Sequence, residues 1–165
     1  MNIAAGKILF STPLLTDPNF DKVVIFLAEH NANGALGFVI NRLFERTFNE
    51  LIAYNQSVPF KLYEGGPVAK ESLFFLHKRP DLIEGGMLVE DSIYLGGDFK
   101  QAVQFINNKT ITEKEIKLFI GYCGWDDGEL EAEVEEGSWL VADNTSATIF
   151  NADISSLWKN GFAKI

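Results

Sequence analysis

The sequence contains one cysteine, Cys123, and only two histidines among its 165 residues. A single cysteine excludes an intrachain disulfide and a cysteine-rich zinc module. It fits a reducing compartment, and we expect the protein to act in the cytoplasm. No apolar run approaches the roughly 20 residues that a membrane-spanning helix needs, so we expect no membrane partner. Lys7 interrupts the apolar N-terminal stretch, which argues against a signal peptide.

Positive charge is also scarce. The chain has 14 Lys and Arg residues against 23 Asp and Glu residues, which gives a formal net charge of −9. This balance works against attraction to nucleic-acid phosphates, so a nucleic-acid partner is not expected. Residues 126–136 contain seven carboxylates and no Lys or Arg. A solvated helix face accounts for this run, and a patch that binds a partner is the alternative.

The length and the 47% hydrophobic content predict one domain over residues 1–165, with a core of its own. Short apolar, β-branched runs predict strands, and Asn33-Gly34 predicts that the runs before and after it form an antiparallel hairpin. The expected strands are 7–10, 23–28, 36–40, 61–64, 73–76, 93–95, 116–122 and 139–142. Because strands and helices do not alternate regularly, the fold class is α+β.

Capping signals predict the helices. Thr47 and Glu50 form a capping box before a helix that ends near Asn55, and Asp98 caps a second helix. Asp127 is expected to cap an acidic helix over 128–136, which Gly137 ends. A last short helix is expected over 153–160.

No standard catalytic motif is present: the sequence has no nucleophile elbow, P-loop, H-E-x-x-H or C-x-x-C. His30 and His77 each follow a predicted strand, and either could pair with Glu29, Glu64 or Asp17. Such a pair could serve a hydrolase or a metal, although a structural role is the simpler interpretation of each histidine. Cys123 precedes two aspartates that disfavour a thiolate, so we interpret it as a small buried side chain. We expect no cofactor, no metal and no catalytic residue.

Two glycine-containing segments stand out. Residues 64–67 (E-G-G-P) form a tight turn whose N–H groups could meet an anion or a ligand oxygen. Residues 121–130 (G-Y-C-G-W-D-D-G-E-L) predict the end of a strand, a turn that projects Trp125, and the start of a helix. The alternative for Trp125 is simple packing over the core.

Several ordered motifs resemble those of the AlgH/YqgE family of bacterial proteins. Residues 29–42 are similar to its E-H-x-x-x-G-A-x-G-x-V-x-N-R element, and residues 64–68 to its G-G-P-V turn. Residues 121–131 are similar to its G-Y-x-G-W-x-x-G-Q/E-L-E element, with Cys123 where many members have Ala. The resemblance implies a bent, mostly antiparallel sheet that forms a partial barrel, with helices packed outside. It implies no reaction, although one branch carries a transcriptional-regulator label tied to alginate control.

These observations favour a non-enzymatic binding or regulatory module that acts through a protein or small-molecule partner. Because the acidic run follows Trp125, that partner should be neutral or basic there. The alternatives are a hydrolase-like enzyme that uses a His/carboxylate pair and, less favoured, a DNA-binding transcriptional regulator. The expected ligand- or partner-binding residues are Glu29, His30, Asn41, Gly65, Gly66, Pro67, Tyr122 and Trp125.

Overall fold

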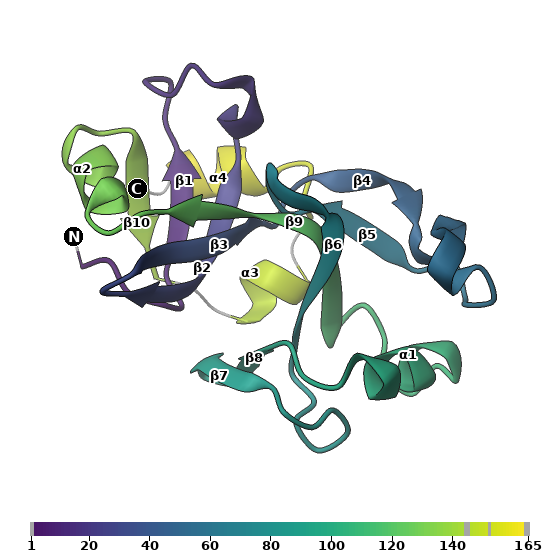
Figure 1. Ribbon diagram of the computed structural model, residues 1–165. Helices are drawn as coiled ribbons and strands as arrows, with labels where there is room; N and C mark the ends of the chain where they lie inside the picture. Colours follow the sequence, from purple (N-terminus) through teal and green to yellow (C-terminus); the bar gives the residue numbers. More distant parts are fainter. Residues whose placement is uncertain (1, 144–145, 152, 164–165) are drawn as a thin grey trace.

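The computed structural model describes residues 2–143, 146–151 and 153–163. Figure 1 shows a bent sheet with short helices at its edges and across its faces. The strands of the described residues are β1 (Ile8–Ser11), β2 (Val24–Asn31), β3 (Gly34–Val39), β4 (Leu43–Thr47), β5 (Lys61–Glu64), β6 (Val68–His77), β7 (Met87–Glu90), β8 (Ile93–Leu95), β9 (Ile116–Trp125) and β10 (Trp139–Ala142). The helices are α1 (Phe99–Asn107), α2 (Glu129–Glu135), α3 (Ser146–Phe150) and α4 (Leu157–Ala163).

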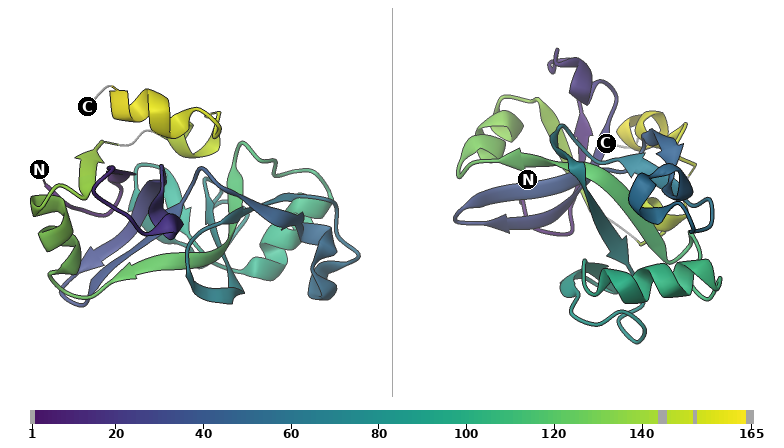
Figure 2. Two further views of the ribbon diagram at one scale, coloured as in Figure 1. Left: turned by 90° about the horizontal axis from the view of Figure 1, so that it is seen from above. Right: turned by 45° about the vertical axis from the view of Figure 1, so that its right-hand side comes forward.

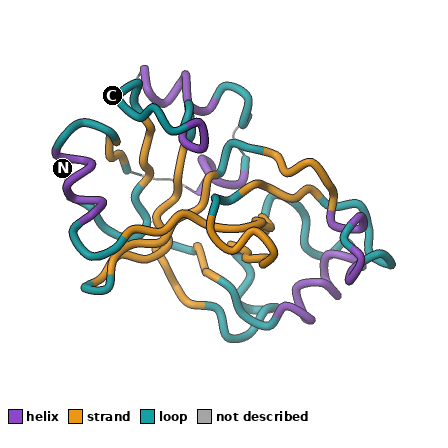
Figure 3. The backbone as a smooth tube through the Cα atoms, turned by 45° about the horizontal axis from the view of Figure 1, so that its top comes forward, coloured by secondary structure: helices purple, strands orange, loops and turns teal. Residues whose placement is uncertain are grey.

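The strands pair in the order β10-β1-β2-β3-β9-β6-β8-β7, and β5 adds β4 beside β9. Every pairing is antiparallel except that of β5 with β9. The sheet bends but does not close, which confirms the predicted α+β class with a mostly antiparallel partial barrel. In Figure 3 the strands occupy the centre and the helical segments lie around them.

The two faces of the sheet are covered differently. One apolar cluster spans both halves of the first face, from Phe26 on β2 to Phe119 on β9, and includes Ile149 and Phe150 of α3. The opposite face carries two separate clusters, one beside α2 and one beside α1. We therefore take the first face as the concave one. Helices α3 and α4 lie together over it, as the left view of Figure 2 shows.

Strand β9 pairs with β3 at one end and with β5 and β6 at the other, so it joins the two parts of the sheet. Gly121 changes which face its side chains point to along the strand. Ile120 belongs to the cluster beside α1 on the opposite, convex face, whereas Tyr122 packs against the cluster on the concave face. Residues two positions apart in a regular strand would point to the same face. The residue between them, Gly121, has φ +75°, a conformation that glycine adopts at little cost. One extra residue in a strand shifts the alternation by one position, as in a β-bulge. This irregularity allows a ten-residue strand to serve both halves of the sheet.

The predicted hairpin is confirmed, with a correction to its turn. Strands β2 and β3 pair antiparallel with Asn31 opposite Gly34, so the turn consists of Ala32 and Asn33. Gly34 has φ +126°, but Asn33 is not among the residues with positive φ. Its backbone amide instead donates to the side-chain oxygen of Asn31 at 2.8 Å. The turn therefore depends on an Asx-type contact and on one glycine.

The predicted helix after Thr47 is wrong. The capping contact forms, with the Thr47 amide donating to Glu50 Oε1 at 2.8 Å. The chain then makes only two 3₁₀ turns, Phe48–Glu50 and Ile52–Tyr54, because Leu51 between them is extended (φ −78°, ψ 133°). Phe48 is buried and stacks on Tyr54 at 4.6 Å. Aromatic packing under the segment thus replaces the continuous helix.

The other capping predictions had mixed outcomes. Asp98 caps α1, accepting from the Gln101 amide, and Ala102 and Ile106 are buried as expected. Asp127 does not cap α2: the N-cap is Gly128 with φ +84°, and the Asp126 amide donates to Glu129 Oε1 at 2.6 Å. The segment expected as a helix over 153–160 turns first, and α4 begins at Leu157. The half-exposed strands β4 and β7 were not predicted, since their sequences lack a buried apolar run.

Candidate functional site

A cavity of about 430 Å³ lies where β2, β3 and β9 end, at the hairpin turn. Its lining residues are Glu29, Asn31, Asn33, Gly34, Ala35, Leu36, Val68, Tyr122, Gly124, Trp125 and Asp126. A smaller apolar cavity of about 240 Å³ adjoins it and shares Glu29 and Leu36. We call the two together the hairpin cleft. Among the residues that the structure describes, no Lys or Arg lines either part, so Glu29 and Asp126 give the cleft a negative charge.

The hairpin cleft contains three of the expected site residues: Glu29, Tyr122 and Trp125. The register explains why. Ala35 lies opposite Trp125, and Leu36 lies opposite both Glu29 and Gly124 in the paired strands. Gly34 lets the turn approach β9, because a Cβ there would lie 2.0 Å from the Trp125 carbonyl oxygen. Residues about 90 positions apart are thereby brought to one end of the sheet.

Trp125 does not project from the surface. Its side chain belongs to the cluster beside α2, and only 8% of the residue is exposed. The indole Nε1 donates to Glu133 Oε1 at 3.1 Å. The packing interpretation of Trp125 is therefore the correct one, although the residue still borders the cleft.

His30 faces α2 rather than the cleft. Its Nε2 lies 3.0 Å from Glu131 Oε2, and this contact holds the pKa of the Glu131 carboxyl below its ordinary value. Successive side chains on a strand point to opposite faces, so Glu29 turns toward the cleft and His30 away from it. His30 thus joins the hairpin to the acidic helix.

Gly65 and Gly66 pack closely against the backbone of β9, next to the cleft. The Gly65 amide donates to the Ile120 carbonyl at 2.8 Å, and its carbonyl accepts from the Val39 amide at 2.8 Å. A Cβ on Gly66 would lie 2.2 Å from the Tyr122 carbonyl oxygen. The Gly65 amide is therefore used within the sheet rather than offered to an anion. Pro67 follows and leads into Val68, which pairs with Tyr122.

Asn41 lies in a different place from the other expected residues. Its Oδ1 accepts from the Val24 amide at 2.9 Å, and its Nδ2 donates to the Lys22 carbonyl at 3.0 Å. It lines a separate cavity beside α4. The sequence motif that contains both Glu29 and Asn41 therefore serves two regions of the molecule.

The second histidine, His77, is fully buried. Its Nε2 contacts the Gly96 carbonyl at 2.9 Å, and its Nδ1 accepts from the Arg79 amide at 3.1 Å. These partners define the neutral ring with the proton on Nε2. Burial lowers the pKa of His77. Neither histidine forms a hydrogen bond with Glu29, Glu64 or Asp17, the partners considered for a hydrolase.

Cys123 is buried, and its Sγ points to the Gly65 carbonyl at 3.5 Å. Burial raises the pKa of this thiol to about 12, which keeps it protonated at neutral pH. A protonated thiol is a poor nucleophile. Within the described parts of the chain, no group of three or more His, Cys, Asp or Glu side chains could hold a metal ion.

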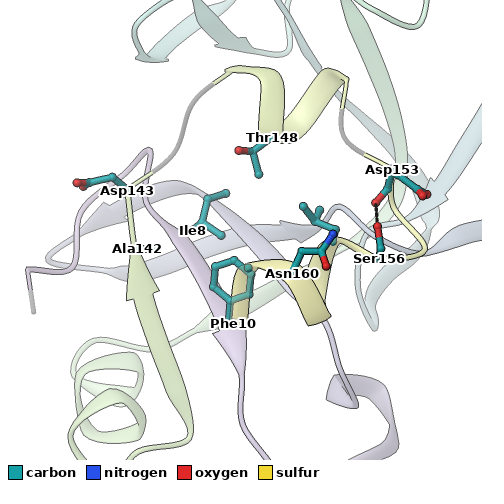
Figure 4. Close-up of a pocket in the computed structure, with 10 residues that line it drawn as sticks. Ile8, Phe10, Ala142, Asp143, Thr148, Asp153, Ser156 and Asn160 are labelled. Atoms are coloured by element: carbon teal, nitrogen blue, oxygen red, sulfur yellow. Dashed lines mark hydrogen bonds between the residues drawn. The ribbon is translucent and has the colours of Figure 1, made fainter. Parts of the chain in front are cut away.

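Sequence reasoning missed several residues that line the cleft. Val68 is 41% exposed despite its place in a strand, and Asn31 and Asn33 come from the hairpin turn. The Pro67-Val68 step, which places a β-branched side chain directly after a rigid turn, is the signal that could have indicated Val68. A third cavity, of about 430 Å³, lies between β1 and the two C-terminal helices, with Asp143 and Asp153 at its two ends (Figure 4). It contains none of the expected site residues.

Comparison with known proteins places the chain in a family. The family model described as AlgH-like matches residues 8–165. The chain belongs to this AlgH-like family. A UPF0301 protein of Chlorobium luteolum is 40% identical over 156 residues, which cover 94% of this chain and 82% of the relative. A UPF0301 protein of Bacteroides thetaiotaomicron is 35% identical, covering 97% and 82%.

Solved structures of AlgH-like architecture superpose well. The solution structure of the AlgH protein from Pseudomonas aeruginosa aligns with a TM-score of 0.79 at 28% identity, covering 96% of this chain and 87% of that one. The crystal structure of protein DIP2367 from Corynebacterium diphtheriae aligns with a TM-score of 0.82 at 18% identity, covering 100% and 88%. The second likeness supports the fold alone. Among the described residues of this family member, no helix is both long and apolar enough to cross a membrane.

Proposed function

We propose that this protein is a non-enzymatic binding module that recognises a basic protein segment in the hairpin cleft. One observation carries the proposal: two adjoining cavities share Glu29, and no cation of the described part of the chain lines them. A segment that places an Arg or Lys beside Glu29 and an apolar side chain in the smaller cavity matches both parts. The lone cysteine supports placing this activity in the cytoplasm.

The electrostatic surroundings support the same choice of partner. Helix α2 begins four residues after Trp125 and carries Glu131 and Glu135 on its exposed surface. Carboxylates that line a cleft, as Glu29 and Asp126 do here, attract cations and repel phosphates and other anions. Attraction of this kind acts over about 8 Å at physiological ionic strength. A basic partner would therefore be guided to the cleft before it makes contact.

The apolar part supplies the remaining contact. Leu36, Phe38, Phe74 and Leu95 line the smaller cavity, and Val68 is exposed beside the larger one. Burying one aliphatic side chain there contributes about 1.5–3 kcal/mol. Together with one charge-assisted hydrogen bond to Glu29, this suits a weak, reversible contact with a short peptide segment.

A backbone-amide NMR titration tests the proposal with a blocked Leu-Arg-Leu peptide as the probe. The expected result is a set of shifts confined to the residues around the two cavities, 29–38, 68, 73–75, 95–97 and 122–126. Glu29→Gln should weaken the affinity about tenfold, the equivalent of 1.4 kcal/mol. Glu45→Gln on β4 is the matched control, since Glu45 is exposed and lies outside the cleft. The proposal is wrong if the peptide causes no shifts, if a Leu-Glu-Leu peptide binds equally well, or if both variants bind alike.

A further inference from the structure

The 18–22 segment is held by two side chains that follow β3. Arg42 Nη1 donates to the Asn19 carbonyl at 2.7 Å, and its Nη2 donates to the carbonyls of Pro18 and Asp21 at 3.2 and 3.1 Å. Asn41 Nδ2 donates to the Lys22 carbonyl at 3.0 Å. These four bonds fix Lys22 with φ +51°, a conformation that costs a non-glycine residue about 1–2 kcal/mol. The position of Lys22 is therefore set by the fold and not by its own preference.

This clamp forms one wall of a cavity of about 630 Å³, and α4 with the residues before it forms the other. The lining residues are Lys22, Asn41, Arg42, Ile154, Ser155, Trp158 and Lys159. Three of them are cationic and none is a carboxylate, although the whole chain has a net charge of −9. We call this cavity the basic cavity.

The positive charge of the basic cavity is not balanced by ion pairs. Among the residues that the structure describes, no carboxylate lies within 4.0 Å of the side-chain nitrogens of Lys22, Arg42 or Lys159. Asp153 is adjacent in sequence, but its carboxylate accepts from the Ser155 amide at 3.1 Å and from the Ser155 hydroxyl at 2.8 Å. Asp21 also neighbours Lys22, and it contributes its carbonyl to Arg42. Three like charges around one hollow favour an anion there.

Trp158 gives the basic cavity an aromatic surface of fixed orientation. Its Nε1 donates to the Ser11 carbonyl at 2.8 Å, and its ring stacks on Phe162 with 4.7 Å between centroids. Trp158 also lines the cavity, so a planar group on a ligand can pack against it. The cavity volume is in the range of about 300–1,000 Å³ that small-molecule sites occupy.

We propose that the basic cavity binds a phosphate-bearing small molecule with a planar ring, of about the size of a nucleoside monophosphate. Lys22 and Lys159 contact the phosphate. Arg42, whose terminal nitrogens already hold the 18–22 segment, contributes its charge at short range and keeps Lys22 in place. The ring packs against Trp158. A dianionic phosphate suits three cations better than a single carboxylate does, because it balances more of their charge. This site is separate from the hairpin cleft, which attracts groups of the opposite charge.

Isothermal titration calorimetry at low salt tests the proposal with adenosine monophosphate, inorganic phosphate and adenosine as probes. Adenosine monophosphate should bind most tightly, inorganic phosphate more weakly, and adenosine weakest. Lys22→Gln and Lys159→Gln should each weaken nucleotide binding about 5–10-fold, the loss of about one charge-assisted hydrogen bond. Lys70→Gln, at an exposed position on β6 outside the cavity, should leave binding unchanged.

Trp158 gives a second readout, since nucleotide binding should change the tryptophan fluorescence in the wild type and in Lys70→Gln. Circular dichroism should show that all variants stay folded. The proposal is overturned if no nucleotide binds, if adenosine binds as well as its phosphate, or if Lys70→Gln weakens binding as much as Lys159→Gln. Any of these results would leave the peptide titration of the hairpin cleft unaffected.

Discussion

Trp125 and Trp139 share a single hydrogen-bond acceptor. Their indole rings meet edge to face with 6.0 Å between centroids, and both Nε1 groups donate to Glu133 Oε1, at 3.1 and 2.9 Å. Glu133 belongs to the acidic run, which the sequence suggested was a solvated face. Two buried donors on one carboxylate instead fix α2 to the sheet. At least this carboxylate of the run has a structural role.

Removing that acceptor should destabilise the protein. Glu133→Ala leaves two indole donors without their partner, and we expect the free energy of unfolding to fall by about 1–3 kcal/mol. Glu135→Ala, at an exposed position of the same helix, should change it by less than about 0.5 kcal/mol. Urea unfolding followed by tryptophan fluorescence measures both variants. Equal effects would show that the shared acceptor contributes no more than a surface charge.

Acid should weaken the fold through His77. Its Nδ1 accepts from the Arg79 amide. Protonation would turn Nδ1 into a donor, and its N–H would then face the Arg79 N–H with no acceptor between them. The pKa of His77 is lowered from 6.5 by burial, so the unfolded chain takes up this proton at a higher pH than the folded protein. Stability from this group is complete above pH 6.5 and is lost as the pH falls through the folded-state pKa.

His77→Gln tests this because an amide can donate to Gly96 and accept from Arg79 in the same way. The wild type should lose stability between pH 7 and pH 5, and the variant should lose less over that interval. Lys70→Gln, at an exposed position on β6, is the control, and it should keep the wild-type pH dependence. Thermal melting between pH 5 and pH 7 measures this loss. The same dependence of the melting temperature on pH in the wild type and in His77→Gln would contradict the prediction.

Lys117 is a buried lysine, and we expect its charge to lower the stability of the fold at neutral pH. It is 4% exposed, its Nζ lies 4.3 Å from the centre of the Tyr63 ring, and burial lowers its pKa to about 8. The folded protein therefore releases this proton more readily than the unfolded chain, whose reference pKa is 10.5. Stability should rise as the pH increases from about 8 to 10.5.

Lys117→Met should raise the free energy of unfolding at pH 7 by about 1–2 kcal/mol, because a side chain of similar shape replaces a desolvated charge. It should also abolish the rise above pH 8. Lys70→Met, at an exposed position on β6, is the control and should do neither. Denaturant unfolding at pH 7 and pH 10 measures both effects. A destabilised Met variant would show that the contact with Tyr63 outweighs the cost of burial.

Position 66 has no room for a side chain, so it requires glycine. A Cβ at this position would lie 2.2 Å from the Tyr122 carbonyl oxygen and 2.6 Å from the Cys123 nitrogen, both of them backbone atoms. Gly66→Ala should cost at least about 3 kcal/mol, the upper range for overpacking. Gly96→Ala isolates backbone strain, since Gly96 has φ +70° and, its chain neighbours apart, no atom of the described residues lies within 4 Å of its Cβ position to crowd a methyl group. That variant should cost about 1–2 kcal/mol. Equal losses in melting experiments would mean that the strand moves aside at Gly66.

Local chemistry made much of the fold predictable. The apolar runs located eight of the strands, because a side-chain period of two and β-branched residues are properties of the chain itself. Asn33-Gly34 indicated the β2–β3 hairpin, and Asp98 indicated the start of α1. The half-exposed strands β4 and β7 could not be predicted, because their stability comes from pairing with β5 and β8 rather than from their own sequences.

The candidate site was less predictable. Glu29, Tyr122 and Trp125 meet because β3 pairs with β9, whereas Asn41, only twelve residues after Glu29, belongs to the basic cavity. The sequence allowed His30 to pair with Glu29, Glu64 or Asp17, but its partner is Glu131, 101 residues away. Sequence spacing carries no information about such partners, because strand pairing decides which distant segments become neighbours.

Local residue patterns were enough to indicate the family, the α+β class, the negative net charge and the places where strands and turns form. The tertiary structure decided how the scarce positive charge and the abundant negative charge are arranged. It gathered Lys22, Arg42 and Lys159 around one cavity and placed Glu29 in a cleft where the described lining residues include no cation. The reason is physical: charge acts through space, and only the packed sheet and its helices set the distances between these groups.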